Sequence, residues 1–390
     1  MAERMTKYER LTAAWNLEEG DRVAVGPLVI YIIPYLAGMS LKETYSNPEK
    51  LVQAAIDCSD IIGDCLHPIM TMFDHQSLLP KSGWDQTTLD WRIWDDFPPK
   101  GNIPSAYFDK VIIDDYESIK EKGFSQFIFN KHIHEEVFNR SIDEFLYKEF
   151  EYPYLHAKAW REYVERTGVV LMMGARACIP FDLFMYYRTF EKFIEDIFDT
   201  PELVKEMCEL VLDYEIVRAM RKAIIMGAGE VPGADTIFYA LGYAGPPYIS
   251  PGVFEEFVWP TLKSGVDKIV NRGFKVHIHF DADLTPVLDI LSHITDGLPK
   301  GKVMIDFEKT DMKKAKEIIG DKVCLMGNVP SAMLVFGTPE EVDACCKQLI
   351  EDCGEGGGFI LGTECEVPWD AKRENVRAIV QAAEKYGQYG

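Results

Sequence analysis

Short apolar runs alternate with longer amphipathic segments along the second half of the chain, from about residue 165 onward. Each run is rich in β-branched or other apolar residues and is bounded by Gly, Asp or Asn, which is typical of a buried strand. The runs that predict strands are Val169–Gly174, Lys275–Phe280, Lys302–Asp306, Lys322–Gly327 and Gly358–Gly362.

The segments between these runs begin like helices. A Ser or Thr followed by Pro, a favoured N-cap and first helical residue, opens Thr200–Gly227, Ser250–Asn271 and Thr338–Asp352. Strands that alternate with helices over short connections predict a parallel sheet with crossover helices, of the α/β class. No phosphate-binding glycine fingerprint follows any predicted strand, which favours a closed (β/α)8 TIM barrel over an open doubly wound sheet.

A single barrel domain is expected over residues 1–390, because no repeat, low-complexity segment or Gly/Ser linker divides the chain. Residues 70–165 differ from the rest, since they are rich in Trp and Pro at first and strongly charged afterwards. We expect this segment of the N-terminal half to be an insertion or elaboration that caps one face of the barrel.

Charge and cysteine usage exclude several classes of protein. The chain carries 41 Lys and Arg against 63 Asp and Glu, a net charge of −22, which repels phosphate backbones and anionic lipids. We therefore expect neither nucleic-acid nor membrane binding.

The nine cysteines are scattered and odd in number, and the charged N-terminus does not resemble a signal peptide. Both observations predict a cytoplasmic protein with free thiols.

Two histidines two positions apart, His277 and His279, lie in the predicted strand Lys275–Phe280. Alternate side chains of a strand share a face, so both imidazoles point the same way and can reach one first-row metal ion. An acidic turn follows the strand, which places the pair near the end where barrel enzymes carry their chemistry. The alternative is two ordinary histidines on a polar face, and a second such pair, His132 and His134, shows that spacing alone does not decide.

A cysteine follows the last predicted strand, within Gly356–Pro368. Among the nine cysteines, Cys365 is the one expected at the C-terminal end of a strand. A thiolate at that position is costly unless a cation or metal ion stabilises it. The alternative is a half-buried thiol without a role.

At these residues the sequence resembles the uroporphyrinogen decarboxylase superfamily, specifically its corrinoid-dependent methyltransferase branch. The likeness covers most of the chain and is weakest between residues 70 and 165. It is carried by Lys7–Leu11, Glu18–Val25, Ser250–Pro251 with Phe254 and Pro260, Leu325–Val329, Gly356–Gly362 and Glu374–Asn375. The resemblance implies an (α/β)8 barrel, in agreement with the alternation of elements.

The resemblance also implies a zinc site. Thiol-methylating members of that branch bind zinc with a His-x-Cys pair on a strand and a distant Cys after the last strand. The pattern places the first ligand on His277 and the distant one on Cys365, whereas His279 replaces the middle Cys. A set of two His and one Cys is still a good zinc set with one position open for substrate.

The loss of one thiolate makes the zinc more electrophilic, which suits the polarisation of an ether oxygen. The resemblance thus implies a methyltransferase of an anaerobic O-demethylase system. Such an enzyme moves a methyl group from a small-molecule donor, such as an aryl methyl ether, to the Co(I) of a corrinoid (cobalamin). The corrinoid is carried by a partner protein. The alternative is the reverse-side enzyme, from the methylcorrinoid protein to a thiol of the coenzyme M type.

Two further alternatives remain at this point. Uroporphyrinogen decarboxylases carry an Arg-rich N-terminal segment for the substrate's carboxylates, but this chain has no Arg between Arg22 and Arg92. A corrinoid-protein docking module without activity would need no zinc and would tolerate the loss of Cys365.

Three other candidate site residues are acidic: Asp235 is expected to follow a barrel strand, Glu256 lies in the predicted helix Ser250–Asn271, and Glu364 is beside Cys365. Asp235, Glu256 and Glu364 are candidate proton donors, ligands or orienting groups, although a capping or surface role would also place them there. A group of mostly aromatic residues is expected to line a cleft suited to an aryl ether, or else to belong to the core. These candidates for substrate binding are Phe181, Tyr186, Phe238, Tyr243, Tyr248, Asn328 and Trp369.

Overall fold

The structure is a computed structural model that describes residues 4–40, 43–44, 47–68, 113, 115–127 and 152–390. Most of the predicted cap segment, with His132 and His134, lies outside the described residues. The strands are β1 Ala24–Val25, β2 Cys65–Leu66, β3 Val170–Leu171, β4 Ala175–Cys178, β5 Thr236–Leu241, β6 Lys275–Phe280, β7 Val303–Phe307, β8 Cys324–Val329 and β9 Phe359–Thr363.

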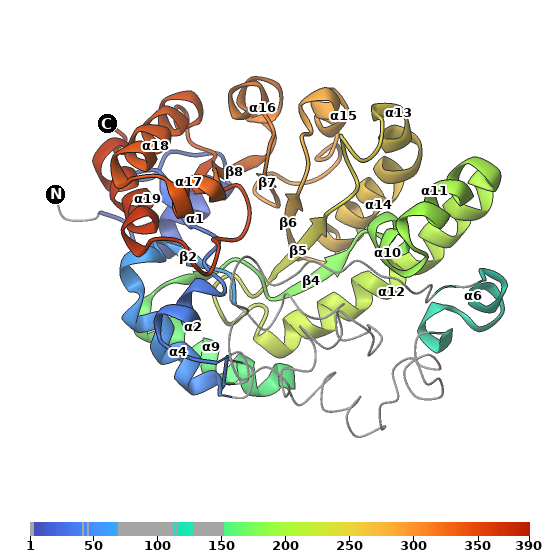
Figure 1. Ribbon diagram of the computed structural model, residues 1–390, viewed down its shortest axis with the longest axis horizontal. Helices are drawn as coiled ribbons and strands as arrows, with labels where there is room; N and C mark the ends of the chain where they lie inside the picture. The colour runs from blue at the N-terminus through green and yellow to red at the C-terminus, as the bar shows by residue number, and fades with distance from the viewer. Residues whose placement is uncertain (1–3, 41–42, 45–46, 69–112, 114, 128–151) are drawn as a thin grey trace.

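Helices lie around the outside of these strands (Figure 1). Before β5 they are α1 Lys7–Trp15, α2 Ile32–Leu36, α4 Pro48–Asp57, α6 Glu117–Lys122, α9 Tyr152–Thr167, α10 Pro180–Tyr187, α11 Phe190–Asp199 and α12 Pro201–Met226. After β5 they are α13 Pro251–Val253, a π-helical turn Phe254–Val258, α14 Trp259–Val270, α15 Leu288–Leu291, α16 Met312–Ile319, α17 Ser331–Phe336, α18 Pro339–Cys353 and α19 Arg373–Tyr386.

Seven strands form one parallel sheet in the order β1-β9-β8-β7-β6-β5-β4, and β2 pairs with β3 in a second parallel ladder. Backbone hydrogen bonds also connect this pair to the chain around the larger sheet. Asp64 N donates to Val25 O of β1, and Leu171 N donates to Pro232 O, in the turn before β5. The predicted α/β class with a TIM-barrel arrangement is confirmed.

The predicted elements agree with the observed ones to within about two residues, with one exception. Val169–Gly174 forms only the short β3, and the chain resumes as β4 after a bend. At Gly174 a Cβ atom would lie 1.9 Å from the Ala234 carbonyl oxygen, so the two backbones approach more closely there than any other residue would permit. The sequence analysis did not predict β5 as a strand.

Apolar side chains fill the interior of the barrel toward the N-terminal ends of its strands. Met172, Met304, Met326 and other buried residues pack there against Trp15 of α1. Polar side chains replace this packing only toward the C-terminal ends of the strands, where the candidate site lies. No helix among the described residues has the length and hydropathy needed to cross a bilayer.

Candidate metal centre and its surroundings

The alternation of β6 directs both histidines into the barrel. Val276 and Ile278 belong to the outer core beneath the helices, whereas His277 and His279 face inward and are at most 4% exposed. In the register of the sheet His277 lies beside Phe238 of β5, and His279 lies one layer higher. The two imidazoles therefore occupy successive layers along the axis of the barrel.

Asp306 of β7 fixes the orientation of His279. It is the register partner of His279, and its Oδ2 lies 2.9 Å from His279 Nδ1. On the other side of the ring, His279 Nε2 lies 2.8 Å from Oδ1 of Asp281. Burial alone would lower the pKa of His279, but the negative charges of Asp281 and Asp306 raise that pKa well above its ordinary value. The imidazole is thus held between two carboxylates.

Cys365 completes a group of three potential ligands. Its Sγ lies 3.3 Å from Asp281 Oδ1, and the ligand atoms of His279, Asp281 and Cys365 all lie within 4.8 Å of one another. Burial first, and the Asp281 charge second, raise the pKa of the Cys365 thiol to about 12.

This group fits a zinc ion by its chemistry. It brings together an imidazole nitrogen, a carboxylate oxygen and a sulfur, which are the three donor types that zinc prefers. Without a cation, Asp281 Oδ1 accepts hydrogen bonds from both the imidazole and the thiol. A buried thiol with a raised pKa becomes a thiolate only where a cation replaces that proton.

His67, immediately after β2, also belongs to this region, although the sequence analysis did not single it out. Its ring centroid lies 5.2 Å from that of His277 and 5.7 Å from that of Phe238. Neither ring nitrogen of His67 or His277 has a hydrogen-bond partner among the described residues. The one feature of the sequence that could have indicated His67 is its position as a polar residue directly after a short apolar run, and this is a weak signal.

Aromatic side chains line one side of the site. Phe238 stacks on His279 with centroids 5.6 Å apart, and the Tyr243 ring lies 5.4 Å from Tyr186 and 5.0 Å from Tyr248. The three tyrosines therefore form one contiguous group, whereas Phe238 lies against His279. We call Phe238, Tyr186, Tyr243 and Tyr248 the aromatic wall.

Asp182 of α10 supports this wall and was not predicted. Its carboxylate accepts hydrogen bonds from the backbone N–H groups of Gly242 and Tyr243, in the loop that carries the tyrosines. Burial raises the pKa of Asp182 to about 7, against these two stabilising hydrogen bonds.

Three other predicted substrate-binding residues have structural contacts. Phe181 is fully buried and packs against Phe193, and Trp369 packs edge-on against Tyr35 with centroids 4.6 Å apart. The Asn328 amide donates to the carbonyls of Glu308 and Thr310, so it holds the turn after β7.

The three predicted catalytic acids lie in different places. Glu364 precedes Cys365 and binds both Lys309 Nζ, at 2.6 Å, and the Ser331 N–H, at 2.9 Å. Asp235 lies at the wrong end of the barrel, because it precedes β5 rather than following a strand. Glu256 lies in the predicted helix but on the outer surface, where it pairs with Lys205 at 2.8 Å.

The sequence profile of uroporphyrinogen decarboxylase (URO-D) matches residues 133–386, which is more than half of the chain. The chain belongs to the URO-D family. This confirms the resemblance that the sequence motifs indicated.

Curated relatives of this URO-D family member carry two kinds of name. The methylcobamide:CoM methyltransferase MtaA of Methanosarcina barkeri is 29% identical over 155 residues, 40% of this chain and 42% of the relative. The methylcobamide:CoM methyltransferase MtbA of Methanosarcina mazei is 25% identical over 230 residues, 59% of this chain and 62% of the relative. A uroporphyrinogen decarboxylase of Pseudoalteromonas atlantica is 33% identical over 76 residues, 20% of this chain and 21% of the relative. The alignments thus span less than two thirds of each relative.

A solved structure supports the fold over nearly the whole chain. A methyltransferase from Methanosarcina mazei superposes with a TM-score of 0.70 and 20% identity, covering 98% of this chain and 99% of that one. At this identity the match establishes the shared fold alone.

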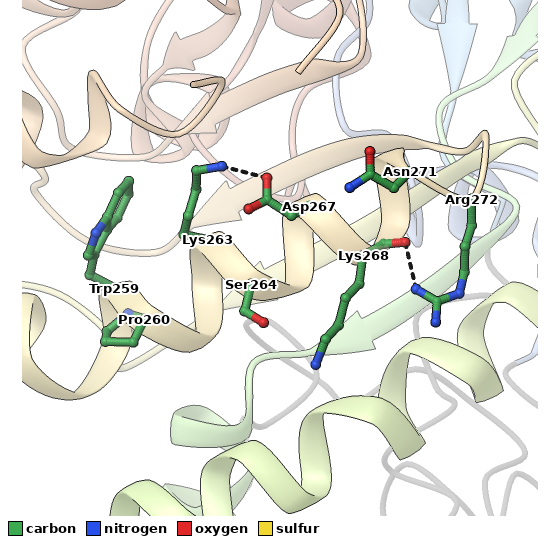
Figure 2. A pocket seen from close by; sticks show the side chains of 8 residues that line it. All are labelled: Trp259, Pro260, Lys263, Ser264, Asp267, Lys268, Asn271 and Arg272. Carbon is green, nitrogen blue, oxygen red and sulfur yellow. Dashed lines mark hydrogen bonds and ion pairs between the residues drawn. The ribbon is translucent and has the colours of Figure 1, made fainter. Parts of the chain in front are cut away.

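The outer surface of this URO-D family member carries a separate hollow of about 630 Å³ along α14 (Figure 2). Within it Lys263 pairs with Asp267, and Arg272 donates to the Lys268 carbonyl. None of the predicted site residues lines it. The lining residues are Trp259, Pro260, Lys263, Ser264, Asp267, Lys268, Asn271 and Arg272.

Proposed function

We propose that the protein is a zinc-dependent methyltransferase of an O-demethylase system, which transfers a methyl group from an aryl methyl ether to the Co(I) of a corrinoid on a partner protein. The convergence of His279, Asp281 and Cys365 at the C-terminal ends of β6 and β9 is the observation that carries this proposal. The names of the Methanosarcina relatives support the class of reaction.

His279 and Cys365 would hold the ion, with a third ligand from either Asp281 or His277. When bound, zinc would act as a Lewis acid on the ether oxygen, and more strongly with one thiolate ligand than with two. Asp306 keeps Nδ1 of His279 engaged, so that Nε2 remains directed toward Cys365 and Asp281. In the overall reaction the methyl–oxygen bond breaks, a methyl–cobalt bond forms from the Co(I) electron pair, and the phenolate takes up a proton.

The aromatic wall supports an aryl donor. Tyr186 and Tyr243 lie beside the site, and edge-to-face packing of rings at 4.5–7 Å is the favoured geometry for a bound aryl group. Phe238 forms the floor beneath His279.

Thiol methylation is the second candidate, because the relatives are named as methylcobamide:CoM methyltransferases. In that direction the methyl group would leave methyl-Co(III) and the thiol would receive it. The same metal-binding residues would serve, so the two candidates differ in the methyl donor.

Decarboxylation of a porphyrinogen is disfavoured by the two arginines that precede β1. Arg10 binds Asp21 at 2.7 Å and Asp64 at 2.6 Å, and Arg22 binds Asp64 at 2.8 Å. This buried cluster precedes β1 and β2, at the opposite end of the barrel from Cys365. These arginines are therefore committed to ion pairs and do not face the site.

We also propose a cytoplasmic location, because all nine cysteines are free thiols.

Methyl transfer to free cob(I)alamin tests the proposal. The zinc-loaded protein is incubated with cob(I)alamin and methoxybenzenes, and methylcobalamin formation is followed by its absorption. We expect formation by the wild type and a loss of at least about 100-fold in Cys365→Ala. Methyl transfer from methylcobalamin to 2-mercaptoethanesulfonate, without ether cleavage, would instead support the second candidate. Absence of both reactions, with the metal bound, would contradict methyl transfer.

A further inference from the structure

The two inward histidines of β6 approach the same oxygen of Asp306 but otherwise meet different groups. His279 Nδ1 lies 2.9 Å from Asp306 Oδ2, and His277 Nε2 lies 3.7 Å from that same oxygen. Asp281 and Cys365 lie on the other side of the His279 ring, where Nε2 is 2.8 Å from Asp281 Oδ1. An ion bound at Nε2 of His279 is therefore within reach of Asp281 and Cys365, but His277 is on the far side of the ring.

Packing holds His277 in this deeper layer. Its ring meets Phe238 edge-on, with centroids 4.8 Å apart and an angle of 85°, and it meets His67 at 5.2 Å. His277 and His67 are both at most 1% exposed. A rotation of His277 toward Cys365 would break these contacts and would have to displace Asp306, which already binds His279.

We propose that Asp281, rather than His277, is the third protein ligand beside His279 and Cys365. His277 is then a positioning residue that packs against Asp306 and so fixes the ring of His279. The assignment rests on the proposed metal-dependent function and departs from the ligand pattern of the thiol-methylating branch, in which the position of His277 is a ligand. Its consequence is a ligand set with one nitrogen, one oxygen and one sulfur.

The chain offers matched variants for a test. Asp281→Ala removes the proposed ligand from a side chain that is 37% exposed, so the core is left intact. Asp283→Ala is the control, because Asp283 lies in the same turn, caps the Thr285 N–H at 2.9 Å and is outside the ligand group. His277→Gln and His277→Phe probe the positioning residue with and without a polar side chain.

The measurement is a titration of the metal-free full-length protein with Co²⁺, followed by competition between Zn²⁺ and a chelator. We expect Asp281→Ala to weaken Zn²⁺ binding by more than about 100-fold and to shift the cobalt ligand-field bands, whereas Asp283→Ala changes neither. A substitution outside the ligand set typically weakens the metal by about 10–100-fold at most. Both His277 variants should stay within that range and keep the wild-type cobalt bands, including the thiolate-to-cobalt band.

The results separate this inference from the function on which it rests. Altered cobalt bands in His277→Gln, or wild-type bands in Asp281→Ala, would overturn the ligand assignment and leave the metal-dependent function standing. If the wild-type protein binds no Co²⁺ or Zn²⁺ at all, both proposals are overturned.

Discussion

Asp64 is expected to be among the most important charged residues for stability, because it neutralises two buried arginines. Its carboxylate is fully buried and accepts from Arg10 Nη1 at 2.6 Å, from Arg22 Nη1 at 2.8 Å and from the Val25 N–H at 2.9 Å. With Asp21, the cluster contains two positive and two negative charges. Asp64→Asn would leave two guanidinium groups facing a single carboxylate.

The expected loss is about 3–5 kcal/mol, the range found when one partner of a buried ion pair is removed. An unfolding entropy of about 2.1 cal/mol/K per residue gives ~0.8 kcal/mol/K for a chain of this length, so Tm should fall by about 4–6 °C. Asp60→Asn is the matched control, since Asp60 also binds two arginines, Arg373 and Arg377, but is 33% exposed. Pairs of that kind contribute about 0–1 kcal/mol, equivalent to roughly 1 °C or less.

Thermal unfolding followed by circular dichroism compares the two variants, with metal content as a second readout. The metal content should not change in Asp64→Asn, because the cluster lies at the opposite end of the barrel from Cys365. Equal Tm values for Asp64→Asn and Asp60→Asn would refute the reasoning. A double variant, Asp64→Asn with Arg22→Met, should recover part of the loss, since it removes one uncompensated charge.

Three further predictions concern stability. Burial raises the pKa of Asp21, but hydrogen bonds from Arg10 and from the Met5 and Arg4 N–H groups lower that pKa well below its ordinary value. The folded state therefore loses stability as the pH falls below about 4. In Asp21→Asn, Tm measured against pH should fall less steeply over this range. Gly265→Ala would place a Cβ 2.5 Å from the Tyr239 hydroxyl and should cost about 1–3 kcal/mol in urea unfolding, whereas Gly252→Ala, with no atom closer than 3.9 Å, should be neutral or stabilising. Thr338→Ala removes the capping box of α18 and should lower the free energy of unfolding by about 1 kcal/mol in the same measurement. A loss below about 0.2 kcal/mol, roughly a tenth of the largest effects found for caps, would contradict this prediction.

The elements that the sequence predicted well are those encoded by local signals. The strand Lys275–Phe280 agrees with β6 at both ends, and Thr200 is the N-cap of the helix that it was expected to open. Alternation within β6 also correctly predicted that its histidines share the inward face. These features depend on residues close together in the chain, so one sequence is sufficient.

The composition of the site depended on contacts between distant segments, which no local signal encodes. Asp306 faces His279 because β7 pairs with β6 in one particular register. His67 approaches His277 from the other strand ladder. Asp235 was misplaced for the opposite reason, because β5 was not predicted and the residue was assigned to the end of a strand rather than to its beginning.

Metal content tests the central claim most directly. The purified protein is analysed for zinc beside His279→Ala, Cys365→Ala and the control Cys345→Ala, which removes a half-buried thiol from α18. We predict about one zinc per chain in the wild type and the control, and its loss in the other two variants. A wild-type protein that holds no zinc, even after reconstitution, would contradict the account.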